Sequence, residues 1–260
     1  MKKTFIKSIE DPVLKEPQLI VGLPGVGNVG KIASDYLINE LNAKRFAVLY
    51  SPHFPYHVTI SEEGIIRLLN NEFFYFISEK KKPDLVILKG DSQSQTISGQ
   101  YEVAGLITDV CKKFNIKKII TMGGYVNTNL DEDPKVFAAI NHPDLNAWIE
   151  KSSIIKCEIG SPVVGTAGLL LGIAKLNDIK GICLLGETPG FISDAKAAKA
   201  ILKQVLALTE LDLDLSKLDE MYQELKEKLE RIEEIEKEKG FIKKLKEKFS
   251  PDVKDLSYFG

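Results

Sequence analysis

Residues 21–30 read VGLPGVGNVG and follow an apolar run typical of a buried strand. Gly25, Gly27 and Gly30 give the spacing G-x-G-x-x-G, which joins a first strand to a first helix in dinucleotide-binding proteins. In those proteins an acidic residue about 20 positions later holds the ribose. The next predicted strand ends in LYSPH, residues 49–53, where no acidic residue stands. We therefore interpret the stretch as a tight strand-to-helix turn, with a phosphate cradle as the alternative.

Outward from this turn, short β-type runs alternate with helical patterns. Such alternation predicts a mostly parallel sheet covered on both faces, that is, an α/β three-layer sandwich. The region 57–77 is rich in β-branched and aromatic residues and predicts an antiparallel insertion. The expected helices cover 28–41, 98–114, 144–151, 165–176 and 194–211, and the expected strands lie near 18–23, 46–50, 84–90, 117–124, 136–141, 154–160 and 181–187.

The composition changes after Leu211, where Leu, Ile, Glu and Lys dominate without Gly or Pro as far as residue 239. We expect three parts: an α/β domain at 1–211, a charged amphipathic helical arm at 212–249 and a flexible tail at 250–260. The arm either folds back on its own domain or associates with another copy. Its candidate self-association residues follow a 4-3-4-3 spacing: Leu218, Tyr222, Leu225, Leu229 and Ile232.

The composition argues against several classes of protein. The 260 residues carry 35 basic and 37 acidic side chains, so the strongly basic surface of a nucleic-acid binder is not expected. No run is apolar over the length of a membrane span, and the start has no signal-peptide pattern. The three cysteines show no C-x-x-C spacing, which fits buried thiols in a reducing compartment. We expect a cytoplasmic protein without a nucleic-acid or membrane partner.

A second group of polar residues lies where the central strands are predicted to end, which is the edge where α/β sheets bind ligands. Asp91 and Glu187, with His57 nearby, would suit general acid/base chemistry, although Asp and Thr here equally serve as helix caps. The alternative ligand crevice comprises Gly25, Gly27, Asp91, Gly124 and Glu187. No His/Cys cluster and no G-x-S-x-G turn occurs, so we expect no metal, cofactor or catalytic residue of those kinds.

The last residues, Leu256 to Gly260, read LSYFG after a charged segment interrupted by Pro251. Two aromatic residues beside a carboxylate form the pattern of a C-terminal anchor that enters a pocket on a partner. Fraying is the alternative for such an end.

Taken in order, several motifs between residues 15 and 211 resemble the archaeal form of the proteasome assembly chaperone family. They are GLPGVGNVGKIASDYLI, SPHFP, LKGDSQ, GQYEVAG, MGGY, GTAGLLLGIAKL, GICLLGETPG and DAKAAKAIL. The resemblance implies a fold similar to purine nucleoside phosphorylases, no catalytic activity, homo-oligomers, and proteasome α subunits as partners. Some members insert a hydrophobic-tyrosine-X tail into pockets of the α-ring. By that pattern Tyr258 is the hydrophobic residue, Phe259 stands at the tyrosine position without its hydroxyl, and Gly260 is last.

These observations predict a non-enzymatic assembly chaperone or activator-like adaptor that docks on the proteasome α-ring through its C-terminal tail. The alternative is a nucleoside- or nucleotide-binding enzyme of phosphorylase type that uses the crevice at the carboxyl ends of the strands.

Overall fold

The structure is a computed structural model that describes residues 1–78, 82–127, 133–150, 152–228 and 230–231. The chain divides into two compact units, Met1–Leu218 and Asp219–Gly260. In the second unit the described residues 219–228 and 230–231 are helical. The first unit carries the sheet.

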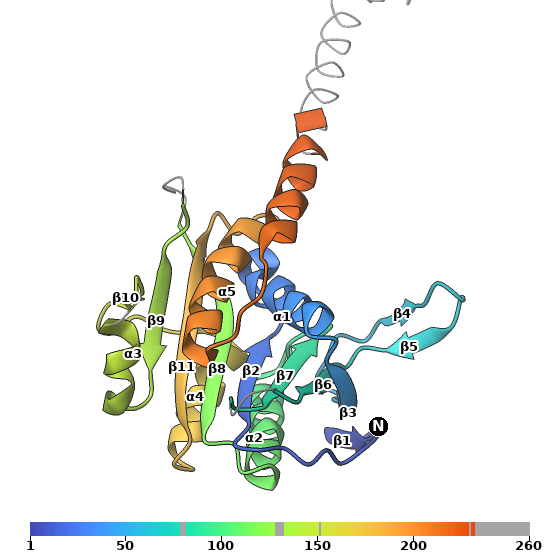
Figure 1. The fold of residues 1–260 in the computed structure, drawn as a ribbon. Helices are drawn as coiled ribbons and strands as arrows, with labels where there is room; N and C mark the ends of the chain where they lie inside the picture. Colours follow the sequence, from blue (N-terminus) through green and yellow to red (C-terminus); the bar gives the residue numbers. More distant parts are fainter. Residues whose placement is uncertain (79–81, 128–132, 151, 229, 232–260) are drawn as a thin grey trace, which may run out of the picture. The chain divides into compact units, whose positions relative to one another are not determined.

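The described part of the first unit contains a nine-stranded sheet and a separate two-stranded hairpin (Figure 1). The order across the large sheet is β1-β3-β6-β7-β2-β8-β11-β9-β10. Its strands are β1 (Phe5–Ser8), β2 (Gln18–Gly22), β3 (Lys44–Tyr50), β6 (Asn71–Phe76), β7 (Leu85–Gly90), β8 (Lys118–Val126), β9 (Val136–Ile140), β10 (Ile155–Lys156) and β11 (Lys180–Thr188).

The centre of the sheet is parallel and its flanks are largely antiparallel. Strands β7, β2, β8 and β11 run parallel to their neighbours in that order, and this is the region where apolar runs alternate with helices. Strands β6, β3 and β1 continue the sheet on one side in antiparallel register, and β9 pairs antiparallel with β11 on the other. The α/β class with a covered central sheet is confirmed, and the antiparallel share is larger than the sequence indicates.

Helices cover both faces of the sheet, as Figure 1 shows. Helices α1 (Val29–Glu40) and α5 (Ala195–Thr209) pack side by side on one face. Helices α2 (Ile97–Lys113) and α4 (Thr166–Lys175) pack together on the other. The side chains of Thr96 and Asp194 cap α2 and α5 by accepting backbone N–H bonds, which is the role that such residues favour at helix starts.

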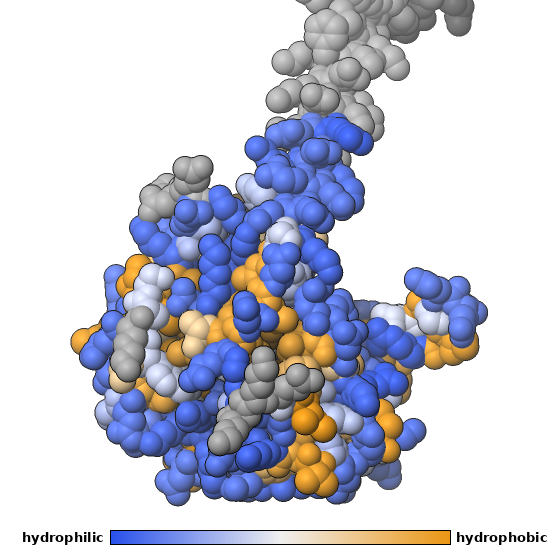
Figure 2. Space-filling model, in the orientation of Figure 1, coloured by the Kyte–Doolittle hydropathy of each residue, from blue (hydrophilic) through white to orange (hydrophobic). Residues whose placement is uncertain are grey.

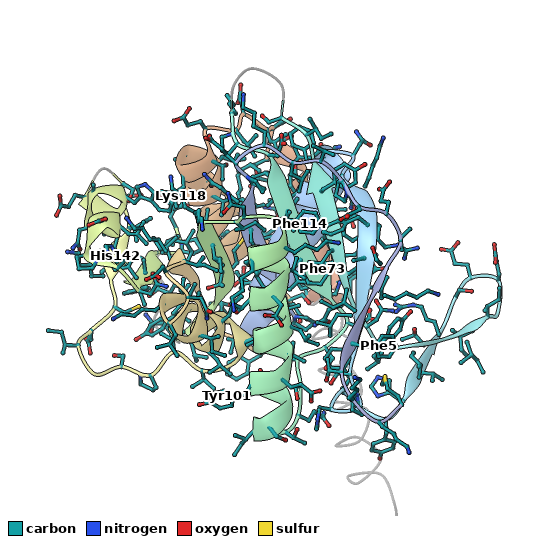
Figure 3. The ribbon with its side chains drawn as sticks, turned by 90° about the horizontal axis from the view of Figure 1, so that it is seen from below. Phe5, Phe73, Tyr101, Phe114, Lys118 and His142 are labelled. Carbon is teal, nitrogen blue, oxygen red and sulfur yellow. The ribbon has the colours of Figure 1, made fainter. Side chains whose placement is uncertain are left out.

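Alternate residues of the central strands fill the two cores. On β2, Leu19 and Val21 contribute to the core beneath α2 and α4, while Ile20 between them is buried on the other face. At the antiparallel side Phe46 stands 6.0 Å from Phe73 and 5.3 Å from Phe114, ring centre to ring centre, with the latter two labelled in Figure 3. This aromatic group joins β3 and β6 to the end of α2.

The predicted insertion at 57–77 consists of two different parts. Strands β4 (Val58–Ile60) and β5 (Ile66–Leu68) form the outer hairpin, which projects from the body in Figure 1. Strand β6 instead belongs to the main sheet. The run expected as a strand at 154–160 contributes only the two residues of β10, and the helix expected at 144–151 consists of η2 (Pro143–Leu145) and α3 (Asn146–Glu150).

Residues 214–218, which follow α5 at the end of the first unit, pack against α1. Leu215 and Leu218 are buried, and the Tyr36 hydroxyl donates to the carbonyl oxygen of Asp214 at 2.6 Å. Lys217 Nζ lies 2.8 Å from the Glu40 carboxylate. These contacts fasten residues 214–218 to α1.

Candidate functional site

Protein atoms fill the space between the sheet and the turn at residues 25–30, here called the glycine turn. It runs from β2 through η1 (Val26–Asn28) into α1. A Cβ added at Gly30 would lie 2.4 Å from the carbonyl oxygen of Met122, and one at Gly22 would lie 2.0 Å from the carbonyl oxygen of Gly30. Gly27 has φ 59°, a left-handed conformation that favours glycine. Helix α1 thus packs against the sheet through positions where a side chain does not fit.

The same turn is also tied to the loop before α5. The Asp194 amide donates to the carbonyl oxygen of Gly27 at 2.8 Å, and Asn28 Nδ2 donates to Ser193 Oγ at 3.1 Å. A Cβ at Gly27 would approach Thr188 Oγ1 to 2.8 Å. The glycines therefore serve the packing of the turn, which supports its interpretation as a joint between strand and helix.

A hollow of about 230 Å³ opens at the carboxyl ends of the central strands. Gly25 and Gly124 of the predicted crevice line it, whereas Gly27, Asp91 and Glu187 are not among its lining residues. The lining is mostly apolar and comprises Val21, Leu23, Gly25, Val26, Gly30, Gln93, Met122, Gly123, Gly124, Val164, Gly165, Ala167 and Leu185.

Gln93 closes the polar side of this hollow. Its Oε1 accepts from the amide of Thr166, the first residue of α4, at 2.8 Å, and its Nε2 donates to the carbonyl oxygen of Pro24 at 2.7 Å. Thr166 Oγ1 donates to Gln100 Oε1 at 2.8 Å. A phosphate at a helix N-terminus needs such amides to be available. At the start of α4 the Thr166 amide already donates to the neutral side chain of Gln93.

The two carboxylates of the predicted acid/base pair have separate partners. Asp91 accepts from Arg67 at 2.5 and 3.0 Å and from the Asn70 amide at 3.0 Å. Glu187, 2% exposed, accepts from Asn127 Nδ2 at 2.6 Å and from the Lys135 amide at 3.2 Å. Strands β2 and β8 lie between β7 and β11, so the two residues stand roughly three strand spacings, about 14 Å, apart.

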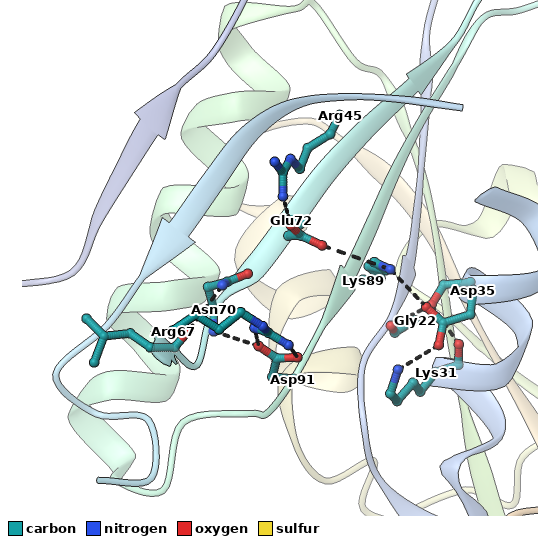
Figure 4. A network of polar contacts seen from close by, with 11 residues as sticks. Gly22, Lys31, Asp35, Arg45, Arg67, Asn70, Glu72, Lys89 and Asp91 are labelled. Carbon is teal, nitrogen blue, oxygen red and sulfur yellow. Dashed lines mark hydrogen bonds and ion pairs between the residues drawn. The ribbon is translucent and has the colours of Figure 1, made fainter. Parts of the chain in front are cut away.

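Charged side chains form a chain of ion pairs beside β6 and β7 (Figure 4). Arg45 pairs with Glu72, and Lys89 Nζ lies 3.9 Å from Glu72 and 3.3 Å from Asp35. Lys31 completes the series at 2.6 Å from Asp35. All of these groups except Arg45 line a polar hollow of about 320 Å³, together with the Arg67–Asp91 pair. Each charged group is partly neutralised by its neighbours, so the electrostatic potential that would attract a charged ligand is small.

The Asp91 carboxyl has a lowered pKa despite its burial. Burial raises the pKa, and the hydrogen bonds from Arg67 and from the Asn70 amide outweigh it because they favour the ionised form. The Arg67 guanidinium pKa is raised, first by its hydrogen bond to Asp91. This pair is therefore a permanent ionic contact at neutral pH, and it joins the outer hairpin to the end of β7.

His53 of the SPHFP motif is held in a network that the sequence analysis does not predict. Its Nδ1 lies 2.8 Å from Thr96 Oγ1, and its Nε2 lies 3.1 Å from Glu102 Oε2. The other Glu102 oxygen accepts from the Thr4 amide at 2.9 Å, a bond that lowers the Glu102 pKa. The network fastens the start of the chain and the loop after β3 to α2. His57, next to β4, is exposed.

A wider hollow of about 550 Å³ lies at the opposite edge, where the central strands begin. Lys118 Nζ stands 5.2 Å from the centre of the Trp148 ring, and Lys82 donates to the carbonyl oxygen of Glu210. Two of the lysines that line the hollow therefore contact α3 and the end of α5.

In the part of the chain that the structure describes, no group of three or more His, Cys, Asp or Glu residues is placed to hold a metal ion. Among the same residues, every helix is too short or too polar to cross a bilayer.

A protein-family model and several solved structures match this chain. The model of the PAC2 family matches residues 19–233. The chain belongs to the PAC2 family. The first unit supplies nearly all of the matched segment, including the glycine turn, Gln93 and the Arg67–Asp91 pair.

Two solved structures of archaeal proteins share the fold of the chain. PbaB of Pyrococcus furiosus, described as an archaeal proteasome activator, matches with a TM-score of 0.85 and 44% identity over 90% of this chain and 100% of that chain. PbaA of the same organism, described as an archaeal homolog of proteasome-assembly chaperone, matches with a TM-score of 0.77 and 25% identity over 95% of this chain and 99% of that chain.

An uncharacterized protein of Methanocaldococcus jannaschii is 34% identical over 261 residues, covering 100% of this chain and 99% of that protein. The resemblance to archaeal proteasome assembly chaperones is confirmed.

The predicted self-association and anchor residues of this PAC2 chain are only partly within the described residues. Leu218 has 0% exposure and packs inside the first unit, so its apolar surface is already used there. Tyr222 and Leu225 are half-buried on the helical part of the second unit. The remaining predicted residues lie outside the described part of the chain: Leu229, Ile232, Tyr258, Phe259 and Gly260.

Proposed function

We propose that this chain is a proteasome adaptor of the assembly-chaperone or activator type, which docks on the α-ring of the core particle through Tyr258, Phe259 and Gly260. The observation that carries the proposal is its 44% identity and TM-score of 0.85 to the activator PbaB, over the whole of that chain. Such an adaptor acts in the cytoplasm, binds protein rather than nucleic acid or membrane, and needs no cofactor.

The chemistry of the last residues supports docking. An aromatic pair next to a carboxylate suits a pocket that combines apolar walls with a cation. Phe259 lacks the phenolic hydroxyl of the family's tyrosine, and the missing hydrogen bond is worth about 0.5–1.5 kcal/mol. A single tail is therefore weakened, and a homo-oligomer that presents several tails to one ring restores affinity through effective concentration.

The features of the hollow at the carboxyl edge favour a role without catalysis. Gln93 occupies the α4 N-terminus, and Asp91 and Glu187 are held apart by their own partners. The phosphorylase-like alternative requires a ligand in this hollow. A ligand present at about 100 times its dissociation constant stabilises a protein by about 2.7 kcal/mol. We expect no such stabilisation by phosphate, nucleosides or dinucleotides in a thermal-shift measurement.

The test of docking is equilibrium binding of the full chain to an archaeal proteasome α-ring, compared with a chain that lacks residues 258–260. We expect the deletion to raise the dissociation constant at least about tenfold, and Phe259→Tyr to lower it by about two- to tenfold. Asp255→Asn, outside the anchor, is the matched control and should bind like the wild type. Unchanged binding after the deletion would refute the anchor, and absence of binding by every variant would refute the partner.

A further inference from the structure

The hollow of about 550 Å³ where the central strands begin, here called the amino-edge hollow, is not used by docking through the tail. Its volume lies within the roughly 300–1,000 Å³ that is typical of ligand sites. Each residue that lines it belongs to the first unit. Figure 3, which views the molecule from below, labels one of these residues, Lys118. The side chains around the amino-edge hollow decide what it can bind.

A buried side-chain amide with an unpaired oxygen lines this hollow. Gln18, the first residue of β2, is 7% exposed, and its Oε1 has no hydrogen-bond partner in the part of the chain that the structure describes. A buried acceptor left unpaired lowers the stability of a fold, because its bonds to water are lost. The terminal torsion of a glutamine is broad, so rotation brings either Oε1 or Nε2 to the hollow. Gln18 can thus accept from an N–H of a ligand and donate to its carbonyl oxygen.

Three lysines line the same hollow, and none of them pairs with a carboxylate among the residues described. Lys118 stands in register with Gln18 on the neighbouring strand, and its Nζ lies 5.2 Å from the centre of the Trp148 ring. Lys82 donates to a backbone carbonyl, that of Glu210. An ammonium group that contacts only a ring or a neutral carbonyl can still pair with a carboxylate. The charged lining side chains are three cations and two carboxylates, an excess of one positive charge: Lys82, Lys117, Lys118, Glu16 and Glu210.

Hydrogen bonds within the first unit fix one wall of the hollow. The carboxylate of Asp84, which is 4% exposed, accepts from the Lys15 amide at 2.6 Å and from the Ser78 amide at 2.8 Å. The backbone carbonyl of Asp84 accepts from the Gln18 amide at 2.9 Å. These bonds join the segment before β2 to the segment before β7, and both segments line the hollow. The hollow is therefore formed in advance, which reduces the entropy lost when a ligand binds.

A ligand that fits this lining carries carboxylates for the lysines, an N–H for Gln18 and some apolar surface for Trp148 and Leu208, which are half-buried. Figure 2 shows the face that α1 and α5 cover, where hydrophilic surface predominates and apolar surface lies between. A phosphate ion or a simple carboxylate offers oxygens to the lysines but no N–H to Gln18. An acidic peptide offers all three features, because every peptide group except that of proline has an N–H beside a C=O.

We propose that the amino-edge hollow binds an acidic peptide segment of a partner protein. The carboxylates of the segment pair with Lys117 and Lys118, and one of its peptide groups exchanges hydrogen bonds with the amide of Gln18. Carbon atoms of the segment contact the ring of Trp148. The inference goes beyond the proposed function and does not depend on it, because it involves none of the anchor residues 258–260.

The test uses Trp148, which is the one tryptophan of the chain, so that its fluorescence reports on this hollow. The full chain is titrated with a capped hexapeptide in which three glutamates alternate with three alanines. We expect a saturable change of fluorescence with a dissociation constant of about 1 mM or less. The same peptide with glutamine in place of glutamate should bind at least about fivefold more weakly, and added salt should weaken binding of the acidic peptide. No saturable change up to about ten times that concentration would overturn the proposal.

Two variants with the same change of net charge test the lysines. Lys117→Gln/Lys118→Gln should raise the dissociation constant of the acidic peptide at least about tenfold. Lys2→Gln/Lys3→Gln, which removes two exposed lysines outside the hollow, is the matched control and should bind like the wild type. The affinity is taken from the concentration dependence of the signal, because loss of Lys118 also changes the starting fluorescence of Trp148. An equal loss of affinity in both variants would contradict a site in the hollow.

Gln18→Met tests whether the buried amide serves the ligand or the fold. Methionine is of similar length and carries no amide, so the unpaired acceptor disappears. We expect the midpoint of urea unfolding to rise and the acidic peptide to bind about three- to tenfold more weakly. An amide with a purely structural role would give a lower midpoint and unchanged binding, and that result would overturn the inference.

Discussion

Gly30 shows how one missing side chain sets the position of a helix. Its Cα faces the carbonyl oxygen of Met122 on β8, and an added Cβ would stand 2.4 Å from that oxygen. We expect Gly30→Ala to lower the free energy of unfolding by about 2–3 kcal/mol, since backbone on both sides has to shift. Chemical denaturation measures the change.

Gly172 provides the matched control for that substitution. It lies within α4, and an added Cβ would meet no atom within 4 Å. Gly172→Ala should raise the free energy of unfolding by about 0.5–1 kcal/mol through helix propensity. Equal effects of the two substitutions would contradict the interpretation of Gly30 as a packing joint.

The cysteines differ in reactivity because they differ in burial. Burial raises the pKa of Cys111 and of Cys183 to about 12, while Cys157 is only half-buried and its pKa is raised less far. At pH 8 a thiol of pKa 12 is ionised in roughly one molecule in 10,000, and the thiolate is the reactive form. Iodoacetamide should therefore label Cys157 first in the native protein, as mass spectrometry of tryptic peptides would show. Labelling of Cys183 at the rate of Cys157 would contradict this account.

At the scale of elements, the Arg67–Asp91 pair makes the attachment of the outer hairpin dependent on pH. A carboxyl whose pKa is lowered by folding contributes stability above its unfolded value, near 3.9, and loses that contribution as the pH falls through the folded pKa. The pair is partly exposed, so we expect Asp91→Asn to cost about 1 kcal/mol at pH 7.

The difference in stability between wild type and Asp91→Asn should shrink as the pH falls below about 4, and urea denaturation from pH 7 to pH 2.5 measures it. Glu63→Gln, an exposed carboxylate at the hairpin tip, serves as the control. A difference that stays constant over this range would show that ionisation of Asp91 is not what secures the hairpin.

The sequence predicts the elements whose pattern is local. Apolar runs such as that of β2 and the helical spacing of α1 identify the central layers, because burial on both faces leaves a continuous apolar run. The glycine spacing likewise predicts the turn at Gly30. Strand β1 is not predicted, since FIKS is short, mostly exposed and defined only by its pairing with β3.

The role of Gln93 is equally invisible in the sequence. Its two partners are Pro24 and Thr166, which lie 69 and 73 residues away along the chain. The sequence predicts both Asp91 and Glu187 at the carboxyl edge of the sheet. It does not show that each carboxylate is bound by partners of its own, which keeps the two from acting together. Long-range hydrogen bonds of this kind decide whether a crevice is open, and no local spacing encodes them.

At the scale of the whole molecule, docking depends on the tail and on the number of tails that one oligomer presents. A tail with Phe259 in place of tyrosine binds one pocket weakly, whereas several tails on one homo-oligomer bind a ring with raised effective concentration. Docking should therefore weaken when the tail is deleted and when the homo-oligomer is dissociated.

The most direct measurement is a competition titration between the full chain and the peptide DLSYFG, residues 255–260, for an archaeal proteasome α-ring. We expect the peptide with a free carboxylate to displace the chain, and the same peptide with an amidated end to displace it at least about tenfold less well. Equal displacement by both peptides, or no binding of the chain to the ring at all, would contradict docking through the tail.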